Sequence, residues 1–438
     1  MSVRISASWP PFRPACECDH TVLPAVTDSR NERSCPSMTL IDTAQDISVV
    51  EARSDRSLAI DVDRGLTIAF MILVNDGMDA AHTFSQLQHS PWNGMTLTDM
   101  VFPNFLFLMG SAVIFAMRRP FREQTSHAAI LRRAARRACI LFAIGLLISV
   151  FPTFGWTTMR YFGVLQRIAI CYFVAVLFYL YVRSFRSIAL TAAGLLAVYW
   201  ILLCRTPLPG LGWPGSDVPL LDIHDNLANW LDQACVSLTQ TLFHTGRLHH
   251  GFRDPEGLLS TIPSLATTLF GLLGGLVMQH GDNRRKVRHL LWLGSATFIA
   301  GAGWSFLFPL NKNLWTSSYA LVCAGASFLF LAACVELFDI RRIQERFRLA
   351  QTVCTGAVIF GANAIVAYVF SELGHGLMTT LTVREGEVPV TLWQWSYEHS
   401  FGVFGAGKTA TLAWALIYVG LCFILNMLLW RRRIFLKI

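Results

Sequence analysis

The stretch DMVFPNFLFLMGSAVIFAM, residues 99–117, decides the class of fold. Its one charged residue is Asp99 at the start, and two arginines, Arg118 and Arg119, follow it directly. A helix of roughly 20 apolar residues crosses the hydrocarbon core of a bilayer, which is about 30 Å thick. An apolar run that ends in arginines is typical of a transmembrane helix whose last turn faces the cytoplasm. The stretch therefore predicts a membrane protein.

The rest of the chain repeats this pattern. Of its 438 residues, 53% are hydrophobic and only 15% are charged, which gives more apolar surface than a soluble fold buries. We predict an all-α, polytopic integral membrane helical bundle with about ten transmembrane helices. These centre on residues 64–80, 99–117, 132–151, 162–182, 187–204, 261–279, 289–308, 315–337, 352–372 and 410–430.

The loops between these stretches set the orientation. Twenty-one Lys and Arg residues fall in alternate loops and the C-terminal tail, against seven in the remaining loops. Because cytoplasmic loops are enriched in Lys and Arg, both termini are predicted to be cytoplasmic. The cations form short clusters instead of one continuous face, so we expect the lipid bilayer and not nucleic acid as the partner.

The ends and loops complete the domain organisation. Residues 1–57 contain no apolar run long enough for a signal peptide and are predicted to be a disordered extension, with Met1 and Met38 both open as translation starts. Residues 58–438 form the transmembrane domain, with long outer loops at 205–260 and 373–409. The cysteines lie singly, without a disulfide framework or the spacing of a metal site.

The densest polar and aromatic cluster on the outer side is QHSPWNGMTLTD, residues 88–99. His89 stands out because histidine accepts and returns protons near neutral pH and can carry an acyl group. The alternative is an interfacial histidine that only bonds a loop carbonyl. Asp99, three residues after Thr96, is interpreted as a helix-start cap. Trp92 could stack on a sugar ring or serve as an interfacial tryptophan.

Other polar residues lie at membrane depth, where they are costly and commonly functional. Arg167, near the start of the fourth predicted helix, needs a partner, for which Asp61 and Glu256 are the alternatives. Gln166 beside it could donate to the same ligand. The outer turn PLNKNLWTSSY contributes Lys312 and Trp315 as candidate site residues. Each could instead only help to hold helices together. No spaced Cys, His and acid set accompanies the adjacent histidines His249 and His250, so we predict no metal.

Six blocks in fixed order resemble a known family. They are DVDRGLTIAFMILVN, HSPWNGMTLTDMVFPNFLFLMG, GVLQRIAICY, DPEGLLSTIPS, PLNKNLWTSSY and GANAIVAY. Together they resemble the transmembrane acyltransferases of the heparan-α-glucosaminide N-acetyltransferase family, in its bacterial form, from about residue 58 to the C-terminus. The sequence departs from the family at Asp63, where an apolar residue is expected.

The resemblance implies an enzyme that moves an acetyl group from cytosolic acetyl-CoA to an amino sugar or glycan across a bacterial inner membrane. It implies that His89 is catalytic, as general base or acyl carrier, with Asn75 as its neighbour. Asn75 and His89 both fall on the predicted outer face, where the acceptor would be. Substrate-binding residues are expected among the polar and aromatic groups of the blocks: Trp92, Asn93, Asp61, Arg64, Gln166, Arg167, Glu256, Lys312 and Trp315.

Two alternatives to the enzyme remain. A secondary transporter or permease for amino sugars or cell-wall fragments would use the polar groups as a midplane site, although the predicted spans hold few acidic residues. A membrane scaffold without catalysis would leave the polar outer cluster unexplained. The GxxxG-like spacing of Gly271 and Gly275 permits close packing within or between subunits, so a homodimer also remains open.

Overall fold

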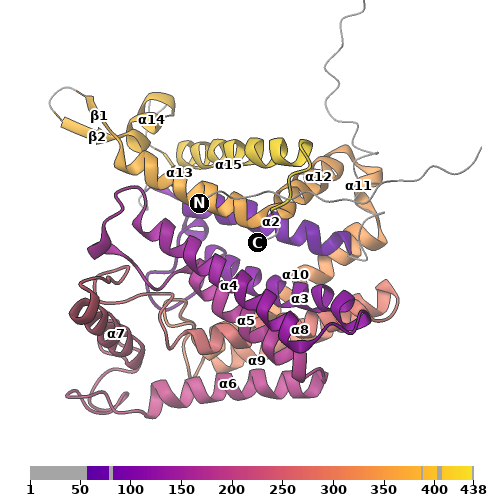
Figure 1. The fold of residues 1–438 in the computed structure, drawn as a ribbon, viewed down its shortest axis with the longest axis horizontal. Coiled ribbons are helices and arrows are strands. Elements are labelled where there is room, and N and C mark those ends of the chain that lie inside the picture. Colours follow the sequence, from indigo (N-terminus) through magenta and orange to yellow (C-terminus); the bar gives the residue numbers. More distant parts are fainter. Residues whose placement is uncertain (1–56, 78–81, 386–387, 402–406, 437–438) are drawn as a thin grey trace, which may run out of the picture.

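The computed structural model describes residues 57–77, 82–385, 388–401 and 407–436. The extension predicted to be disordered, with both candidate start residues, thus lies outside the described residues except for Ser57. The described chain is mostly helical, and its long helices run side by side through the molecule (Figure 1). The predicted all-α membrane bundle is confirmed as a fold class.

Each of the ten predicted apolar stretches contains helix. The long helices are α2 (Leu58–Asn75), α3 (Val101–Arg122), α4 (His127–Val150), α5 (Val164–Tyr181), α6 (Phe185–Arg205), α8 (Thr261–Gln279), α9 (Asn283–Trp304), α10 (Ser317–Cys334), the pair α12 (Arg348–Ala362) and α13 (Ala364–Thr380), and α15 (Lys408–Arg431). Among the described residues, six helices are long and apolar enough to cross a membrane, or seven if the α12–α13 pair counts as one span. The number ten and the cytoplasmic termini stay predictions.

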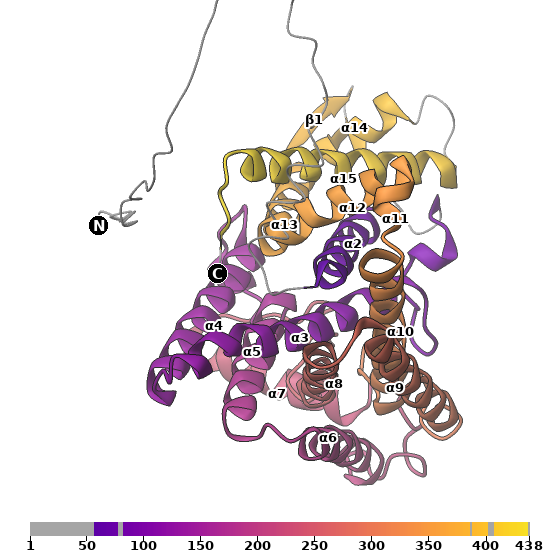
Figure 2. The same ribbon diagram turned by 90° about the vertical axis from the view of Figure 1, so that its right-hand side faces the viewer.

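The centre of the bundle is the contact between α3 and α8 (Figure 2). At Gly110 a Cβ atom would lie 2.1 Å from the carbonyl oxygen of Thr268, and at Gly271 it would lie 2.0 Å from that of Phe107. Only glycine permits this approach of two backbones. At Gly275 a Cβ would lie 2.6 Å from Ile114 of α3. The GxxxG-like pair therefore packs within the chain and gives no support to a homodimer.

Helix α2 packs on α12, and α12 is followed by a sharp break. The axes of α12 and α13 differ by 81°, and the break falls at Asn363. The Asn363 side chain donates to the carbonyl of Ile434 at 3.0 Å and accepts from the backbone N–H of Leu436 at 3.0 Å. The stretch predicted at 352–372 is thus two helices, because Asn363 bonds the C-terminal segment at the point where the helix direction changes.

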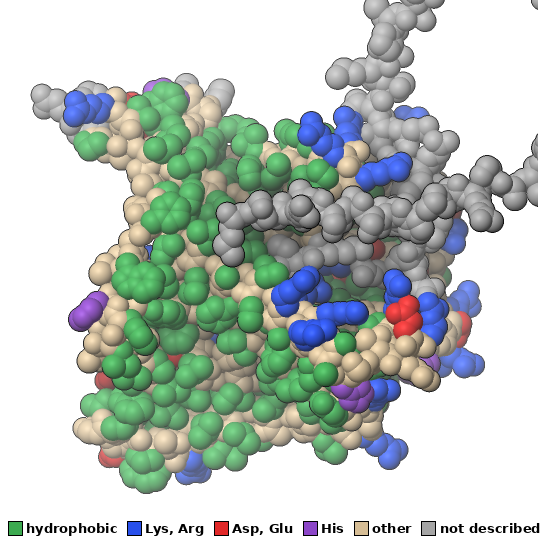
Figure 3. Space-filling view, viewed as in Figure 1, with side chains coloured by type: hydrophobic (Ala, Val, Ile, Leu, Met, Phe, Trp, Pro, Cys, Tyr) green, Lys and Arg blue, Asp and Glu red, His purple; other side chains and the backbone are tan. Residues whose placement is uncertain are grey.

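The predicted outer loops both contain structure and lie at one end of the bundle (Figure 1). The first holds α7 (Leu227–Phe243), and the second holds the antiparallel hairpin β1 (Thr382–Glu385) and β2 (Val388–Thr391), followed by α14 (Leu392–Ser400). Most of the visible Lys and Arg side chains gather toward the opposite end, and the face between is largely hydrophobic (Figure 3). This separation matches the charge asymmetry of the loops. The short elements are η2 (Ser85–Leu87), η3 (Thr98–Met100), η4 (Trp156–Thr158), η5 (Val335–Ile340) and α11 (Ile343–Arg346).

Candidate active site

The polar loop before α3 is folded around the carboxylate of Asp99. One carboxylate oxygen, Oδ2, accepts from the backbone N–H of Ser90 at 3.1 Å and from that of Thr96 at 3.0 Å. The Thr96 hydroxyl also donates to this oxygen and to the carbonyl of Gln88. The cap interaction expected between Thr96 and Asp99 is therefore present, and it fixes the course of the loop.

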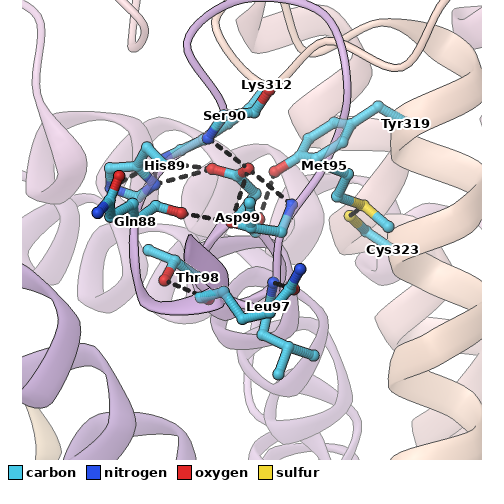
Figure 4. A network of polar contacts seen from close by, with 12 residues as sticks. Gln88, His89, Ser90, Met95, Leu97, Thr98, Asp99, Lys312, Tyr319 and Cys323 are labelled. Atoms are coloured by element: carbon cyan, nitrogen blue, oxygen red, sulfur yellow. Dashed lines mark hydrogen bonds and ion pairs between the residues drawn. The ribbon is translucent and has the colours of Figure 1, made fainter. Parts of the chain in front are cut away.

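The second oxygen of Asp99 holds His89. Asp99 Oδ1 lies 2.8 Å from His89 Nδ1, with the carboxylate fully buried and 48% of the histidine side chain exposed (Figure 4). The Tyr319 hydroxyl donates to the Asp99 backbone carbonyl at 2.5 Å. A buried carboxylate that bonds one ring nitrogen fixes the ring orientation and tautomer.

A tight turn brings Lys312 to the same place. Asn311 Oδ1 accepts from the backbone N–H of Leu314 at 2.9 Å, and Asn311 Nδ2 donates to Asn93 Oδ1 at 3.1 Å. Trp315 closes the turn at φ 52°, a left-handed conformation that costs a non-glycine residue on the order of 1 kcal/mol or more. The turn and the His89 loop are thus tied together by the Asn93–Asn311 contact.

Lys312 completes a three-residue group with His89 and Asp99. Its Nζ lies 2.9 Å from His89 Nδ1, 3.1 Å from His89 Nε2 and 3.8 Å from Asp99 Oδ1. Burial lowers the pKa of Lys312 below its ordinary value, although Asp99 and Glu256 both favour the charged amine. An ammonium with a lowered pKa, next to a half-exposed imidazole, is suited to stabilise negative charge or to exchange protons.

Glu256 belongs to a buried ion-pair network behind Lys312. Arg160 contacts Glu256 and Asp254, each at 2.5 Å. Burial alone would raise the pKa of Glu256, but Arg160, Arg167 and Lys312 together bring it below its ordinary value. The cations on several sides therefore favour the charged form of Glu256 against the burial that opposes it.

Arg167 is almost fully buried, with 1% of its surface exposed. It donates to the carbonyl of Gly257 at 2.9 Å and to the Ser260 hydroxyl, and its guanidinium carbon lies 5.2 Å from the centre of the Trp315 ring. Its Nε and Nη1 have no hydrogen-bond partner in the described part of the chain. Of the two alternatives for its partner, Glu256 acts on it electrostatically, whereas Asp61 is bonded elsewhere.

The remaining predicted residues divide into those near this group and those apart from it. Trp92 donates from Nε1 to the carbonyl of Leu221 at 2.9 Å and carries the Arg253 guanidinium over its ring, so it ties down the first outer loop. Gln166 Nε2 lies 3.5 Å from the carbonyl of Arg160. Asp61 and Arg64 pair with each other at 2.8 Å, and Arg64 donates to the carbonyl of Gly361, next to the α12–α13 break.

Asn75 contacts a second polar group that the sequence did not single out. Its Nδ2 lies 3.5 Å from Glu372 Oε1. Next to it, His375 Nδ1 lies 3.1 Å from the buried carboxylate of Asp76, and the His375 ring packs against Trp393 of α14. A histidine and two acids from distant parts of the chain meet here, so no local sequence pattern marks the group.

No group of three or more His, Cys, Asp and Glu side chains within the described ranges is arranged to hold a metal ion. The candidate site is lined by imidazole, ammonium, guanidinium and carboxylate groups.

Comparisons with known proteins point to one family. A family model described as the catalytic domain of heparan-alpha-glucosaminide N-acetyltransferase matches residues 56–303. The chain is 26% identical over 374 residues to the heparan-alpha-glucosaminide N-acetyltransferase of Homo sapiens and 27% identical over 371 residues to that of Mus musculus. These matches cover 74% and 73% of this chain and 54% of each relative. The chain thus spans about half the length of the curated relatives that it matches.

Proposed function

Because this chain belongs to the heparan-alpha-glucosaminide N-acetyltransferase family, we propose that it is a transmembrane acyltransferase, located in a bacterial inner membrane, with acetyl-CoA as donor. Its acceptor is the amine of an amino sugar or glycan on the periplasmic side. The observation that carries the proposal is the group of His89, Asp99 and Lys312, in which a buried carboxylate orients a half-exposed imidazole. Acyl transfer to an amine needs such a base.

In a single displacement, the amine nitrogen attacks the thioester carbonyl and His89 takes the proton that the amine loses. The carbon–sulfur bond then breaks, and the thiolate receives that proton from the imidazolium, giving CoA and the N-acetyl product. In the two-step alternative, the imidazole nitrogen attacks the thioester carbonyl, the carbon–sulfur bond breaks and CoA leaves as the thiolate. The amine then attacks the acetyl-imidazole, the bond between the acetyl carbon and the imidazole nitrogen breaks, and the proton that the amine loses neutralises the thiolate. Asp99 supports both routes, since it favours the proton on Nδ1, so that Nε2 is the base or nucleophile. Lys312 Nζ lies 3.1 Å from Nε2 and must move off its lone pair before either step.

Two cations are placed to stabilise the oxyanion that forms at the carbonyl. Lys312 contacts both ring nitrogens of His89. Its charge therefore lies beside the thioester carbonyl, whether His89 acts as nucleophile or as general base. Arg167 is farther inside and has two unpartnered donors among the described residues, which suits a contact with the polar arm of the donor. Asn75 contacts Glu372, so it would act on the acceptor and not on the His89 ring.

The test is acetyl transfer from labelled acetyl-CoA to glucosamine by the purified full chain in detergent. We expect transfer by the wild type and a loss of at least ~10²-fold in His89→Gln, in line with removal of a general base. The matched control is His399→Gln, an exposed histidine of α14 on the same outer side, which should keep full activity. Transfer that survives in His89→Gln at the level of the control would overturn the assignment of His89.

The same purified protein can be used to distinguish the two catalytic routes from each other and from the transporter alternative. An acyl-histidine route predicts ping-pong kinetics and label that stays on wild type separated rapidly from acetyl-CoA at neutral pH, but not on His89→Gln, when the amine is omitted. A single displacement predicts no retained label. Uptake of an amino sugar into liposomes without consumption of acetyl-CoA would instead favour a permease and contradict the proposed function.

A further inference from the structure

A groove lies on the surface between α9 and the inner end of α10, away from His89. Its volume is about 890 Å³, within the range of sites that hold a small organic ligand. One wall comes from α9 and the other from η5, which extends α10 toward the predicted cytoplasmic side. The two helices are side by side (Figure 2), and Gly294 and Gly325 let their backbones approach closely.

The inner end of the groove is cationic. Arg284 and Arg288 lie in the first two turns of α9, and Arg341 follows η5. Arg341 is already paired, because its Nε lies 2.7 Å from Glu336 Oε1. Within the described ranges, no carboxylate lies within ion-pair distance of Arg284 or Arg288. Asp282, which directly precedes α9, pairs with Arg285 at 3.3 Å. The guanidinium groups of Arg284 and Arg288 are therefore open to an external anion.

The rest of the groove is apolar and open. Leu291, Trp292 and Ile299 line it and are 46%, 74% and 68% exposed. At ~1.5 Å per residue, the wall runs about 22 Å along α9 from Arg284 to Ile299, far enough to pass from the membrane boundary into the hydrocarbon core. A cationic head end above an apolar wall complements an amphiphile with an anionic head.

We propose that this groove binds an anionic glycerophospholipid of the inner leaflet, with its phosphate at Arg284 and Arg288 and an acyl chain along Leu291 to Ile299. Basic pockets between helices on the cytoplasmic side are suited to anionic head groups. A soluble phosphate, including that of CoA, shares the head-group chemistry but gains nothing from the exposed apolar wall. The inference is independent of the acyltransferase function.

The test is a titration of the delipidated full chain in detergent with phosphatidylglycerol and with phosphatidylcholine of the same acyl chains, read by native mass spectrometry. At about 1 kcal/mol per arginine, the double variant Arg284→Ala/Arg288→Ala should bind phosphatidylglycerol roughly 30-fold more weakly. The matched control is Arg132→Ala/Arg133→Ala, which removes two exposed arginines of α4 on the same predicted side. It should change binding by less than about threefold.

Further measurements distinguish a lipid phosphate from a soluble phosphate as the ligand. Trp292→Ala should weaken phosphatidylglycerol binding severalfold, and millimolar CoA or inorganic phosphate should not displace the lipid. The proposal is overturned if the two double variants weaken binding equally, if phosphatidylcholine binds as well as phosphatidylglycerol, or if CoA displaces the lipid. Should Arg284→Ala/Arg288→Ala not fold, Arg284→Gln/Arg288→Gln replaces it in the same titration. A dimer that buries the groove and excludes lipid would also overturn the proposal.

Discussion

Two histidine–aspartate pairs lie in the predicted outer half of this bundle, and their surroundings differ in charge. In the first pair, His89 and Asp99 lie 2.8 Å apart, and in the second, His375 and Asp76 lie 3.1 Å apart, each with a buried carboxylate. The neighbour of His89 is the ammonium of Lys312, whereas the neighbour of His375 and Asp76 is a second acid, Glu372. The cation beside His89 suits the first pair to proton exchange, whereas the acids around His375 suit the second to a stable ion pair.

The largest expected effect follows from replacing the aspartate of each pair by asparagine, which removes the charge and keeps the shape of the side chain. Asp99→Asn loses the charge that orients His89 and should lower kcat for acetyl transfer by ~10²-fold or more, with a smaller change in KM. Asp76→Asn should lower kcat by less than about threefold. Steady-state kinetics of both purified variants measures this difference. Equal losses of kcat in the two variants would break the comparison.

The next effect concerns the cation beside His89. The lowered pKa of Lys312 means that its charge is lost on the alkaline side at a lower pH than for an ordinary lysine, so activity should fall there. Lys312→Arg keeps the charge at all accessible pH values and should remove this alkaline limb, while Lys312→Met should cost roughly tenfold or more in kcat. The pH profile of kcat measures both. An alkaline limb that persists unchanged in Lys312→Arg would contradict the role given to Lys312.

A smaller effect is expected at the second pair, and on stability instead of rate. His375→Gln leaves the buried Asp76 carboxylate without its cation and should destabilise the fold by about 1–3 kcal/mol. In the double variant Asp76→Asn/His375→Gln, much of that stability should return, because the Asp76 charge is removed together with its partner. Thermal unfolding in detergent reports both variants. A large loss of kcat in His375→Gln with unchanged stability would place this histidine in the chemistry.

The last effect concerns Asp232, which supports the segment that binds Arg167 and should affect stability but not rate. Asp232 of α7 accepts from the backbone N–H of Leu258 at 2.8 Å, next to the Gly257 carbonyl that Arg167 binds. Burial raises the pKa of Asp232 from 3.8 to about 7. The folded state therefore holds a proton that the unfolded state releases near pH 4, and the stability this proton gives is lost as pH rises to about 7.

Replacement of Asp232 by asparagine should remove this pH dependence. Asp232→Asn retains an acceptor for the Leu258 N–H, so its stability relative to the wild type should increase between pH 5 and pH 8, by an amount on the order of 2 kcal/mol. Unfolding temperatures across that pH range give the measurement. A constant difference between the two proteins at all pH values would mean that Asp232 does not titrate in the native state.

The class of fold was predictable because apolar runs and loop charges act locally along the chain. The break at Asn363 was not, since it depends on hydrogen bonds to Ile434 and Leu436, about 70 residues away in sequence. The position of the His89 loop likewise depends on a residue that is distant in sequence, because Asn93 accepts from Asn311. A single sequence without its relatives carries no signal for such contacts.

In the candidate site, single residues could be predicted from the sequence, but their contacts could not. His89 could be chosen from its chemistry and block, and Lys312 from its own block, but nothing in the sequence says that they touch. Asp99 was interpreted only as a helix cap, and the structure has it capping with one oxygen and holding His89 with the other. The Asp76 and His375 pair joins residues 299 positions apart, so it was missed.

The most direct test of the central proposal is a sided assay in proteoliposomes, with acetyl-CoA on the cytoplasmic face alone and glucosamine on the outer face alone. The proposal predicts N-acetylglucosamine on the outer side for the wild type, and at least ~10²-fold less for His89→Gln reconstituted to the same extent. Product that forms only when donor and acceptor share one side, or that forms equally in His89→Gln, would contradict the account.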